Sequence, residues 1–407
     1  MQPQRFLYNI VMIYDFTFYN PTRIHFGKGA LAYLNDELNL YGESILLVYG
    51  KASIKKIGLY DQVMTILKEA GKKVVELSGV SANPRWSEVV EGCRLAKENN
   101  VSLILAVGGG SVIDCSKGIA ACTYATGDAW DRYYIHQNPV DNEIIPIGTI
   151  LTMVGTGSEM NSSSVVTNEE QKLKIGCGFD DRLNPRFSIL NPEYTYSVPQ
   201  YQMVSGIFDI FSHLMELYFS GEDDNVSDYL IEGDMRALIV AARKAMIDPK
   251  DYEARSNIMC CATVALNRML GLSKKQDWIV HQIEHQVGAY TDCAHGIGLA
   301  VITPAYLTFI YKYGLPKFVR YAVNVWGVDP TDKSDDIIAL EGIAALAAFI
   351  EELGIPTTLR DLGVTEDMLE PIAQTTEENI IARYGNGTTG YRKIRHDEIL
   401  EVLQNCY

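Results

Sequence analysis

The feature that most constrains the fold is a change in hydrophobic period near the middle of the chain. In the first half, short apolar runs alternate with amphipathic stretches. The apolar runs have the pattern of buried strands and lie at 44–49, 73–77, 101–107 and 143–149. The stretches between them have helical spacing and lie at about 62–70, 86–99 and 112–126. Strands that alternate with helices predict a mostly parallel sheet with helices on both faces.

From about Pro192 onward, helical periodicity replaces this alternation and almost no strand pattern remains. The helical stretches lie at 203–219, 226–246, 252–269, 277–290, 337–353 and 396–404. A chain of 407 residues is long enough for two or three domains. We therefore predict an α/β domain at residues 1–192 and an all-helical domain at residues 193–407, with the boundary at the Asn191-Pro192 turn.

The charge balance argues against polyanionic partners. Asp and Glu number 51 against 35 Lys and Arg, which gives a formal net charge of −16. Such a surface repels both the phosphate backbone of nucleic acids and the surface of an anionic membrane. No run of about 18 apolar residues is present, so we expect no membrane-spanning helix.

The cysteines and the N-terminus predict a cytoplasmic protein. Eight cysteines occur and none forms a Cys-x-x-Cys pair, so we expect buried, reduced thiols rather than disulfides or zinc knuckles. The N-terminal stretch does not resemble a signal peptide, because Asn9 breaks its apolar run and no cleavage pattern follows. Met12 is an alternative start, which would make residues 1–11 an extension.

Histidines and an aspartate form the first candidate site. Three of the seven histidines, His281, His285 and His295, fall within fifteen residues. Asp209 and His213 are four residues apart, as are His281 and His285, so each pair projects from one helix face. Taken alone, each residue fits an ordinary polar helix position, but Asp209 has apolar neighbours and a buried carboxylate needs a partner. One carboxylate and several imidazoles together predict a site for Fe²⁺, Zn²⁺ or a similar divalent ion.

Glycine-rich turns form the second candidate site. Gly108, Gly109, Gly110 and Ser111 follow a buried strand and open a helix, which is the arrangement that presents backbone N–H groups to a phosphate. A structural strand–helix junction is the alternative. The usual GxGxxG motif is not met, because Ile113 occupies the place of the third glycine.

The segment after the first strand bears on which dinucleotide binds. Many nicotinamide enzymes place a carboxylate near the adenosine ribose, where it repels a 2′-phosphate. The residues from Tyr49 to Ser53 include no acid and one lysine, Lys51. This favours NADP(H), with NAD(H) as the alternative, unless Lys51 is simply a solvated surface residue.

Several segments together resemble the iron-containing (group III) alcohol dehydrogenases, and most closely the branch of butanol dehydrogenases and NADPH-dependent aldehyde reductases. Residues 18–31 resemble the opening hairpin of that family, 83–86 its NPRW-like loop and 107–117 its pyrophosphate-binding GGGS motif. Residues 154–168 resemble the segment beside the nicotinamide. GIFDIFSHLME and HQIEHQVGAYTDCAHG resemble its two metal motifs.

The resemblance implies a fold and a set of site residues. It implies an α/β cofactor domain and a helical metal domain of the dehydroquinate-synthase-like, iron alcohol dehydrogenase fold, with the active site between them. It implies Asp209, His213, His281 and His295 as metal ligands and His285 as a non-ligand residue of the proton relay. The implied dinucleotide contacts are Gly50, Ser53, Asn83, Gly108, Gly109, Gly110, Ser111, Asp114, Thr152, Thr156 and Lys174.

Two departures from the family pattern bear on the substrate. Gln286 stands where relatives often have proline, and LTMV at 151–154 stands where relatives often have a TTAG-like sequence. Neither change removes a ligand, but both concern residues that are expected near the cleft.

The expected activity is hydride transfer between NAD(P)H and a small aldehyde or primary alcohol of the butanal and butanol type. Fe²⁺ is expected first and Zn²⁺ next, and the family suggests a homodimer. A polyol dehydrogenase of the glycerol type and a lyase related to dehydroquinate synthase are the enzymatic alternatives. A non-catalytic nucleotide- or metal-sensing protein is the alternative from another class.

Overall fold

A six-stranded parallel sheet forms the N-terminal half of the computed structural model, which describes residues 15–221, 224–272, 274–385 and 390–407. The strand order is β1-β8-β5-β4-β2-β3, and all five pairings are parallel. The strands are β1 Arg23–Phe26, β2 Ser44–Tyr49, β3 Lys73–Ser78, β4 Leu103–Gly108, β5 Ile147–Leu151 and β8 Phe187–Leu190. The suggested extension at residues 1–11 and the alternative start at Met12 lie outside the described residues.

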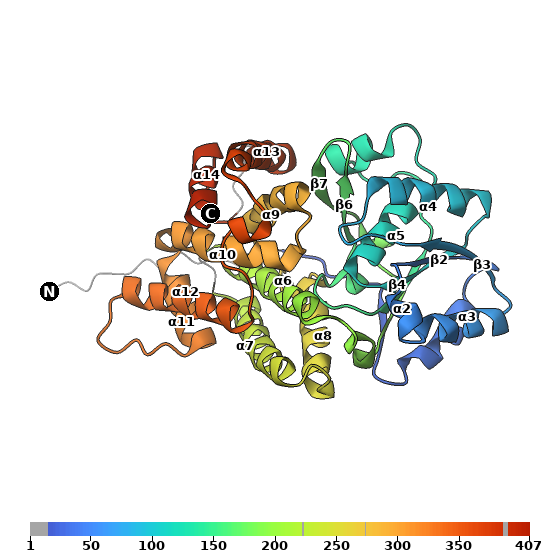
Figure 1. Cartoon of the computed structure of the whole chain (residues 1–407), viewed down its shortest axis with the longest axis horizontal. Coiled ribbons are helices and arrows are strands. Elements are labelled where there is room, and N and C mark those ends of the chain that lie inside the picture. The colour runs from blue at the N-terminus through green and yellow to red at the C-terminus, as the bar shows by residue number, and fades with distance from the viewer. Residues whose placement is uncertain (1–14, 222–223, 273, 386–389) are drawn as a thin grey trace.

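Helices cover both faces of this sheet, as the alternation predicts (Figure 1). One face carries α4 (Trp86–Glu98) and α5 (Gly110–Cys122), and the other carries α1 (Leu34–Leu38), α2 (Ser53–Lys56) and α3 (Leu59–Glu69). Neighbouring side chains of β2 alternate between the two cores, so that Leu46 packs with α4 and α5 while Leu47 packs with α1 and α3. Because both faces are covered, the strand is apolar along its whole length.

Three local features differ from the sequence prediction. The prediction of an opening hairpin at residues 18–31 is wrong for the described residues. The strand in this segment, β1, pairs in parallel with β8, and Arg23 lies opposite Phe187. The fourth predicted strand starts at Ile147 rather than at Glu143, directly after Pro146. A separate antiparallel pair, β6 (Ser163–Asn168) and β7 (Leu173–Gly178), was not predicted, because its strands are rich in serine and glycine.

The C-terminal half is helical throughout the described residues and packs around one hydrophobic core. Its helices are α6 Gln200–Tyr218, α7 Val226–Ile247, α8 Tyr252–Leu266, α9 Ile279–Thr291, α10 His295–Ile310, α11 Leu315–Trp326, α12 Asp335–Glu352, α13 Glu366–Tyr384 and α14 His396–Asn405. Of these, α11 and α13 were not predicted, and α10 had no predicted range beyond a helix start expected near His295. No helix in the described ranges has both the length and the apolar character that crossing a membrane requires. We keep the proposed domain boundary at Asn191-Pro192, where the last strand gives way to this helical half.

Two glycines bring the elements around the site into backbone contact. A Cβ atom at Gly296, near the start of α10, would lie 1.8 Å from the carbonyl oxygen of Ser205 on α6. A Cβ atom at Gly206 would lie 1.9 Å from the carbonyl oxygen of Val154, in the segment after β5. Because only glycine permits such close approach, these positions hold α6 against both α10 and the sheet.

Candidate active site

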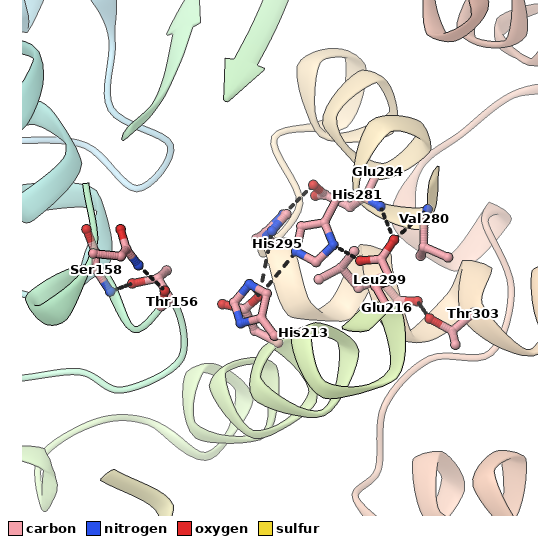
Figure 2. Close-up of polar contacts among 12 residues, drawn as sticks. Thr156, Ser158, His213, Glu216, Val280, His281, Glu284, His295, Leu299 and Thr303 are labelled. Atoms are coloured by element: carbon pink, nitrogen blue, oxygen red, sulfur yellow. Dashed lines mark hydrogen bonds and ion pairs between the residues drawn. The ribbon is translucent and has the colours of Figure 1, made fainter. Parts of the chain in front are cut away.

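Three imidazoles from three helices, His213, His281 and His295, face one carboxylate oxygen, Oδ1 of Asp209; Figure 2 shows the three rings close together. Asp209 and His213 lie one turn apart on α6, His281 comes from α9, and His295 is the first residue of α10. The Nε2 atoms of His213, His281 and His295 lie 3.4, 3.9 and 3.7 Å from Oδ1 of Asp209. The structure therefore brings together all four residues that the sequence suggested as metal ligands.

The chemistry of this cluster fits a divalent metal ion. Oδ1 of Asp209 and Nε2 of His281 are buried and make no hydrogen bond. Ligand atoms of Asp209, His281 and His295 all lie within 4.8 Å of one another. Burial lowers the pKa of His213 to about 3, so its imidazole is neutral, as metal ligation requires. Unpaired buried polar atoms are costly, and an ion bound among them would offset that cost.

Two glutamates that were not expected from the sequence orient the imidazoles. Glu216 on α6 accepts a hydrogen bond from Nδ1 of His281 and also from the backbone N–H of Val280, at 2.9 Å. Glu284 on α9 contacts Nδ1 of His295. With Nδ1 engaged in this way, Nε2 of each ring is left to face Asp209, which is the usual role of a carboxylate behind a metal-bound histidine.

The spacing of these two glutamates in the sequence could have linked them to the suggested ligands. Glu216 stands seven residues after Asp209, and Glu284 stands three after His281, so each shares a helix face with a ligand. Glutamate is common on solvated helix faces, however, and only the structure shows that both are buried. Burial opposes ionisation of Glu284, but His295 and Lys174 together lower its pKa to about 2, which keeps it an anion.

His285 lies beside the suggested metal ligands without joining their cluster around Asp209. Its ring centroid lies 6.2 Å from that of His281 and 5.6 Å from that of His295. Its Nε2 is buried and makes no hydrogen bond. Burial and the neighbouring Lys174 hold the pKa of His285 well below its ordinary range, so the ring is neutral and would hold an added proton only weakly. Glu284, His285 and His295 form a second group of ligand type, but Lys174 and His295 already occupy the Glu284 carboxylate.

A cavity of about 170 Å³ connects the cluster around Asp209 with several of the residues that were predicted to bind the cofactor. It is lined by all four suggested ligands and by His285. From the predicted cofactor residues it is lined by Asn83, Ser111, Asp114, Thr156 and Lys174. The cluster around Asp209 and five of the eleven predicted dinucleotide contacts therefore share one cavity.

The remaining predicted cofactor residues do not line the cavity, but they lie along the carboxyl edge of the sheet. Gly50 follows β2 and Ser53 opens α2, while Thr152 follows β5. Gly108, Gly109 and Gly110 form the turn from β4 into α5. The first N–H groups of α5 have no acceptor within the helix and are available to a phosphate. In parallel sheets this edge is where ligands bind.

Two of the predicted cofactor residues also have structural partners. The Asp114 carboxylate accepts hydrogen bonds from the Ser158 hydroxyl at 2.6 Å and from the Val165 N–H at 2.9 Å. The Nζ atom of Lys174 lies 3.1 Å from the Glu284 carboxylate and pairs with it in a buried ion pair. Both residues also line the cavity, so their contact with a dinucleotide stays a prediction.

Comparison with known proteins agrees with this arrangement. The iron-containing alcohol dehydrogenase family model matches residues 21–192, and the C-terminal model of the Fe-containing alcohol dehydrogenase family matches residues 203–407. The chain is 42% identical over 396 residues to NADH-dependent butanol dehydrogenase A of Clostridium acetobutylicum, covering 97% of this chain and 100% of that protein. It is 34% identical to the NADPH-dependent aldehyde reductase YqhD of Escherichia coli, covering 97% and 98%.

Solved structures show the same fold. The crystal structure of NADH-dependent butanol dehydrogenase A from Thermotoga maritima superposes with a TM-score of 0.92 at 34% identity and covers 97% of this chain and 99% of that one. Both halves of the chain are thus accounted for by one family over nearly their whole length. The chain belongs to the iron-containing alcohol dehydrogenase family and is a nicotinamide-dependent oxidoreductase that acts on alcohols or aldehydes.

Proposed function

We propose that this enzyme interconverts a small aldehyde and its primary alcohol, with NAD(P)H as the hydride donor in the reductive direction. One observation carries the proposal. The cluster around Asp209, together with His285, lines the same cavity as Ser111 and Thr156 on the cofactor side. That cavity would bring the nicotinamide, the substrate carbon and the metal cluster together. The names of the relatives, butanol dehydrogenases and an aldehyde reductase, support this substrate class.

Asp209, His213, His281 and His295 would hold the metal ion, with Fe²⁺ proposed first and Zn²⁺ next. Such an ion supplies a Lewis acid that polarises a carbonyl oxygen and lowers the pKa of an alcohol. Glu216 and Glu284 fix the orientation of His281 and His295, so that the ligand atoms are already in place before substrate arrives.

His285 would relay the proton that the product oxygen takes up. In the reductive direction a hydride passes from C4 of the nicotinamide to the carbonyl carbon, and the product oxygen takes up a proton. His285 is neutral, buried and without a hydrogen-bond partner at Nε2, so it is free to pass a proton between the site and water.

The N-terminus of α5 would hold the pyrophosphate, and the end of β2 would hold the adenosine ribose. Lys51 is exposed there, and the segment 49–53 carries no acid. We therefore propose that NADP(H) is preferred, although relatives named for NADH and for NADPH both occur. We also propose a cytoplasmic location, which the eight unpaired thiols support. The resemblance to the family is the basis for proposing a homodimer.

Paired substitutions at the two α9 histidines test this assignment. We expect His281→Ala to lose bound metal and turnover together, because it removes a ligand. We expect His285→Ala to retain the metal while turnover falls, because it removes only the proton relay. Metal content by elemental analysis and NADPH oxidation with butanal give the two readouts. Full activity of His281→Ala without metal would refute the metal role, and loss of metal in His285→Ala would show that the ligands are misassigned.

A further inference from the structure

One cation on the wall of the cavity beside Asp209 has no ion-pair partner in the part of the chain that the structure describes. Arg383, on α13, lines the cavity, and its Nη1 donates a hydrogen bond to the carbonyl oxygen of Gly176 at 2.7 Å. None of the described carboxylates forms an ion pair with it. Lys174, the other strongly basic residue on the wall, is paired with Glu284. Arg383 is half-buried, so its guanidinium leaves a positive charge available to an anionic ligand beside the cavity.

The position of Arg383 places it on the substrate side of the cavity. A Cβ atom at Gly176 would lie 3.2 Å from Cε1 of His285 and 3.7 Å from Nη1 of Arg383, so the two side chains flank the same glycine. The guanidinium thus lies beside the proposed proton relay, whereas the N-terminus of α5 is the element that presents N–H groups to the pyrophosphate. Because Nη1 is held by the Gly176 carbonyl, the orientation of the guanidinium is set before a ligand binds.

A second polar group lies on the same wall. Gln282 on α9 is buried, and its side-chain amide makes no hydrogen bond to any described residue. Gln282, Lys174 and Arg383 also line a smaller neighbouring cavity of about 60 Å³, so these three residues separate the two spaces. The acidic residues that line the catalytic cavity are Asp114 and Asp209. Asp114 is hydrogen-bonded to Ser158 and Val165, and Asp209 lies in the metal cluster.

We propose that Arg383 and Gln282 form a binding site for a carboxylate at the end of the substrate opposite the aldehyde. The enzyme would therefore prefer short aldehydes with a terminal carboxylate. This inference rests on the proposed function, since the aldehyde end must reach the metal cluster. The free N–H groups of Arg383 suit a planar carboxylate, and the amide of Gln282 supplies a further donor. In the reverse direction the substrates are the matching ω-hydroxy acids. The reaction stays a hydride transfer with uptake of one proton, because the carboxylate takes no part in it.

The test compares 4-oxobutanoate with its neutral methyl ester, using the metal-loaded enzyme and saturating NADPH. We expect kcat/KM for the acid to exceed that for the ester by about 10- to 100-fold, the range expected for a charged hydrogen bond. In Arg383→Gln this ratio should fall to near 1, and in Arg383→Lys it should lie between the two. Arg236→Gln is the matched control, because Arg236 is an exposed helix arginine that also donates to a backbone carbonyl, that of Asn324. Its ratio should equal that of the wild type.

A second readout does not need turnover of the acid. Butanedioate should inhibit butanal reduction competitively in the wild type and lose that effect in Arg383→Gln. The inference is overturned if the wild-type enzyme does not favour the acid over the ester. It is also overturned if Arg383→Gln raises the KM for NADPH without changing the acid-to-ester ratio, which would assign Arg383 to the cofactor. No turnover of butanal, acid or ester by the wild type would instead refute the proposed function itself.

Discussion

Replacing Glu216 by glutamine tests how the metal cluster is organised. One oxygen of Glu216 accepts from the backbone N–H groups of Val280 and His281, at 2.9 and 3.2 Å, and the other faces Nδ1 of His281. An amide can keep the backbone bonds only by turning its NH₂ group toward Nδ1. Two donors then oppose each other, so the imidazole hydrogen must move to Nε2, the atom that faces Asp209. The substitution therefore takes the metal-binding lone pair from His281 while changing little in shape.

The size of the effect follows from this tautomer change. Loss of a partner behind a metal ligand costs about 10- to 100-fold in affinity, and we expect the upper end, about 2.8 kcal/mol, because the ligand atom itself becomes protonated. Competition with a chelator measures the loss of Zn²⁺ affinity. The rise in Tm on adding Zn²⁺ gives a second measure of the same loss. Glu232→Gln is the control: Glu232 is also buried and accepts from the Tyr218 hydroxyl at 2.7 Å, but it does not touch a suggested ligand. Unchanged Zn²⁺ affinity in Glu216→Gln, or an equal loss in Glu232→Gln, would refute the reasoning.

Four further substitutions have definite expected outcomes. Gly296→Ala would place a Cβ atom 1.8 Å from the Ser205 carbonyl oxygen, and we expect it to destabilise the protein by about 1–3 kcal/mol. Gly233→Ala, which meets nothing within 4 Å, should stabilise by about 0.5–1 kcal/mol, and equal Tm values for the two variants would contradict the packing argument. Burial raises the pKa of Asp234 to about 6, above its ordinary value of 3.8, so ionising this buried group favours unfolding as pH rises through that interval. Asp234→Asn should therefore raise Tm at pH 7 and have little effect at pH 4, and equal shifts at both would count against it. Lys51→Glu places a carboxylate near the expected ribose site, so the ratio of kcat/KM for NADPH to that for NADH should fall at least ~10-fold. An unchanged ratio would identify Lys51 as a solvated surface residue.

The architecture was largely predictable because hydrophobic period is a local property. The strands at 44–49 and 73–77 and those helices of the C-terminal half that were predicted appear close to their expected bounds. Pairing between distant segments was not predictable in this way. Arg23 lies opposite Phe187, more than 160 residues away, and both β1 and β8 are only four residues long. Nothing in such short runs distinguishes a hairpin from a parallel pair.

The candidate site was predictable where it depends on spacing and not where it depends on burial. Asp209 and His213 lie four residues apart on one helix, and this spacing led to the metal cluster. Glu216 and Glu284 share faces with the ligands but look like ordinary helix glutamates until their burial is known. The same holds for Arg383, whose significance lies in the absence of an ion-pair partner among the described residues and in its place beside Gly176.

The central claim is that the cluster around Asp209 supports metal-dependent hydride transfer to an aldehyde. The most direct measurement is the initial rate of NADPH oxidation with butanal, before metal removal, after chelation and after Fe²⁺ or Zn²⁺ is restored. We predict turnover in the loaded protein, its loss on chelation and its recovery with added metal. Undiminished turnover by the metal-free protein would contradict the account, as would no turnover of any aldehyde by the loaded protein. Oxidation of glycerol without reduction of butanal would instead favour the polyol dehydrogenase alternative.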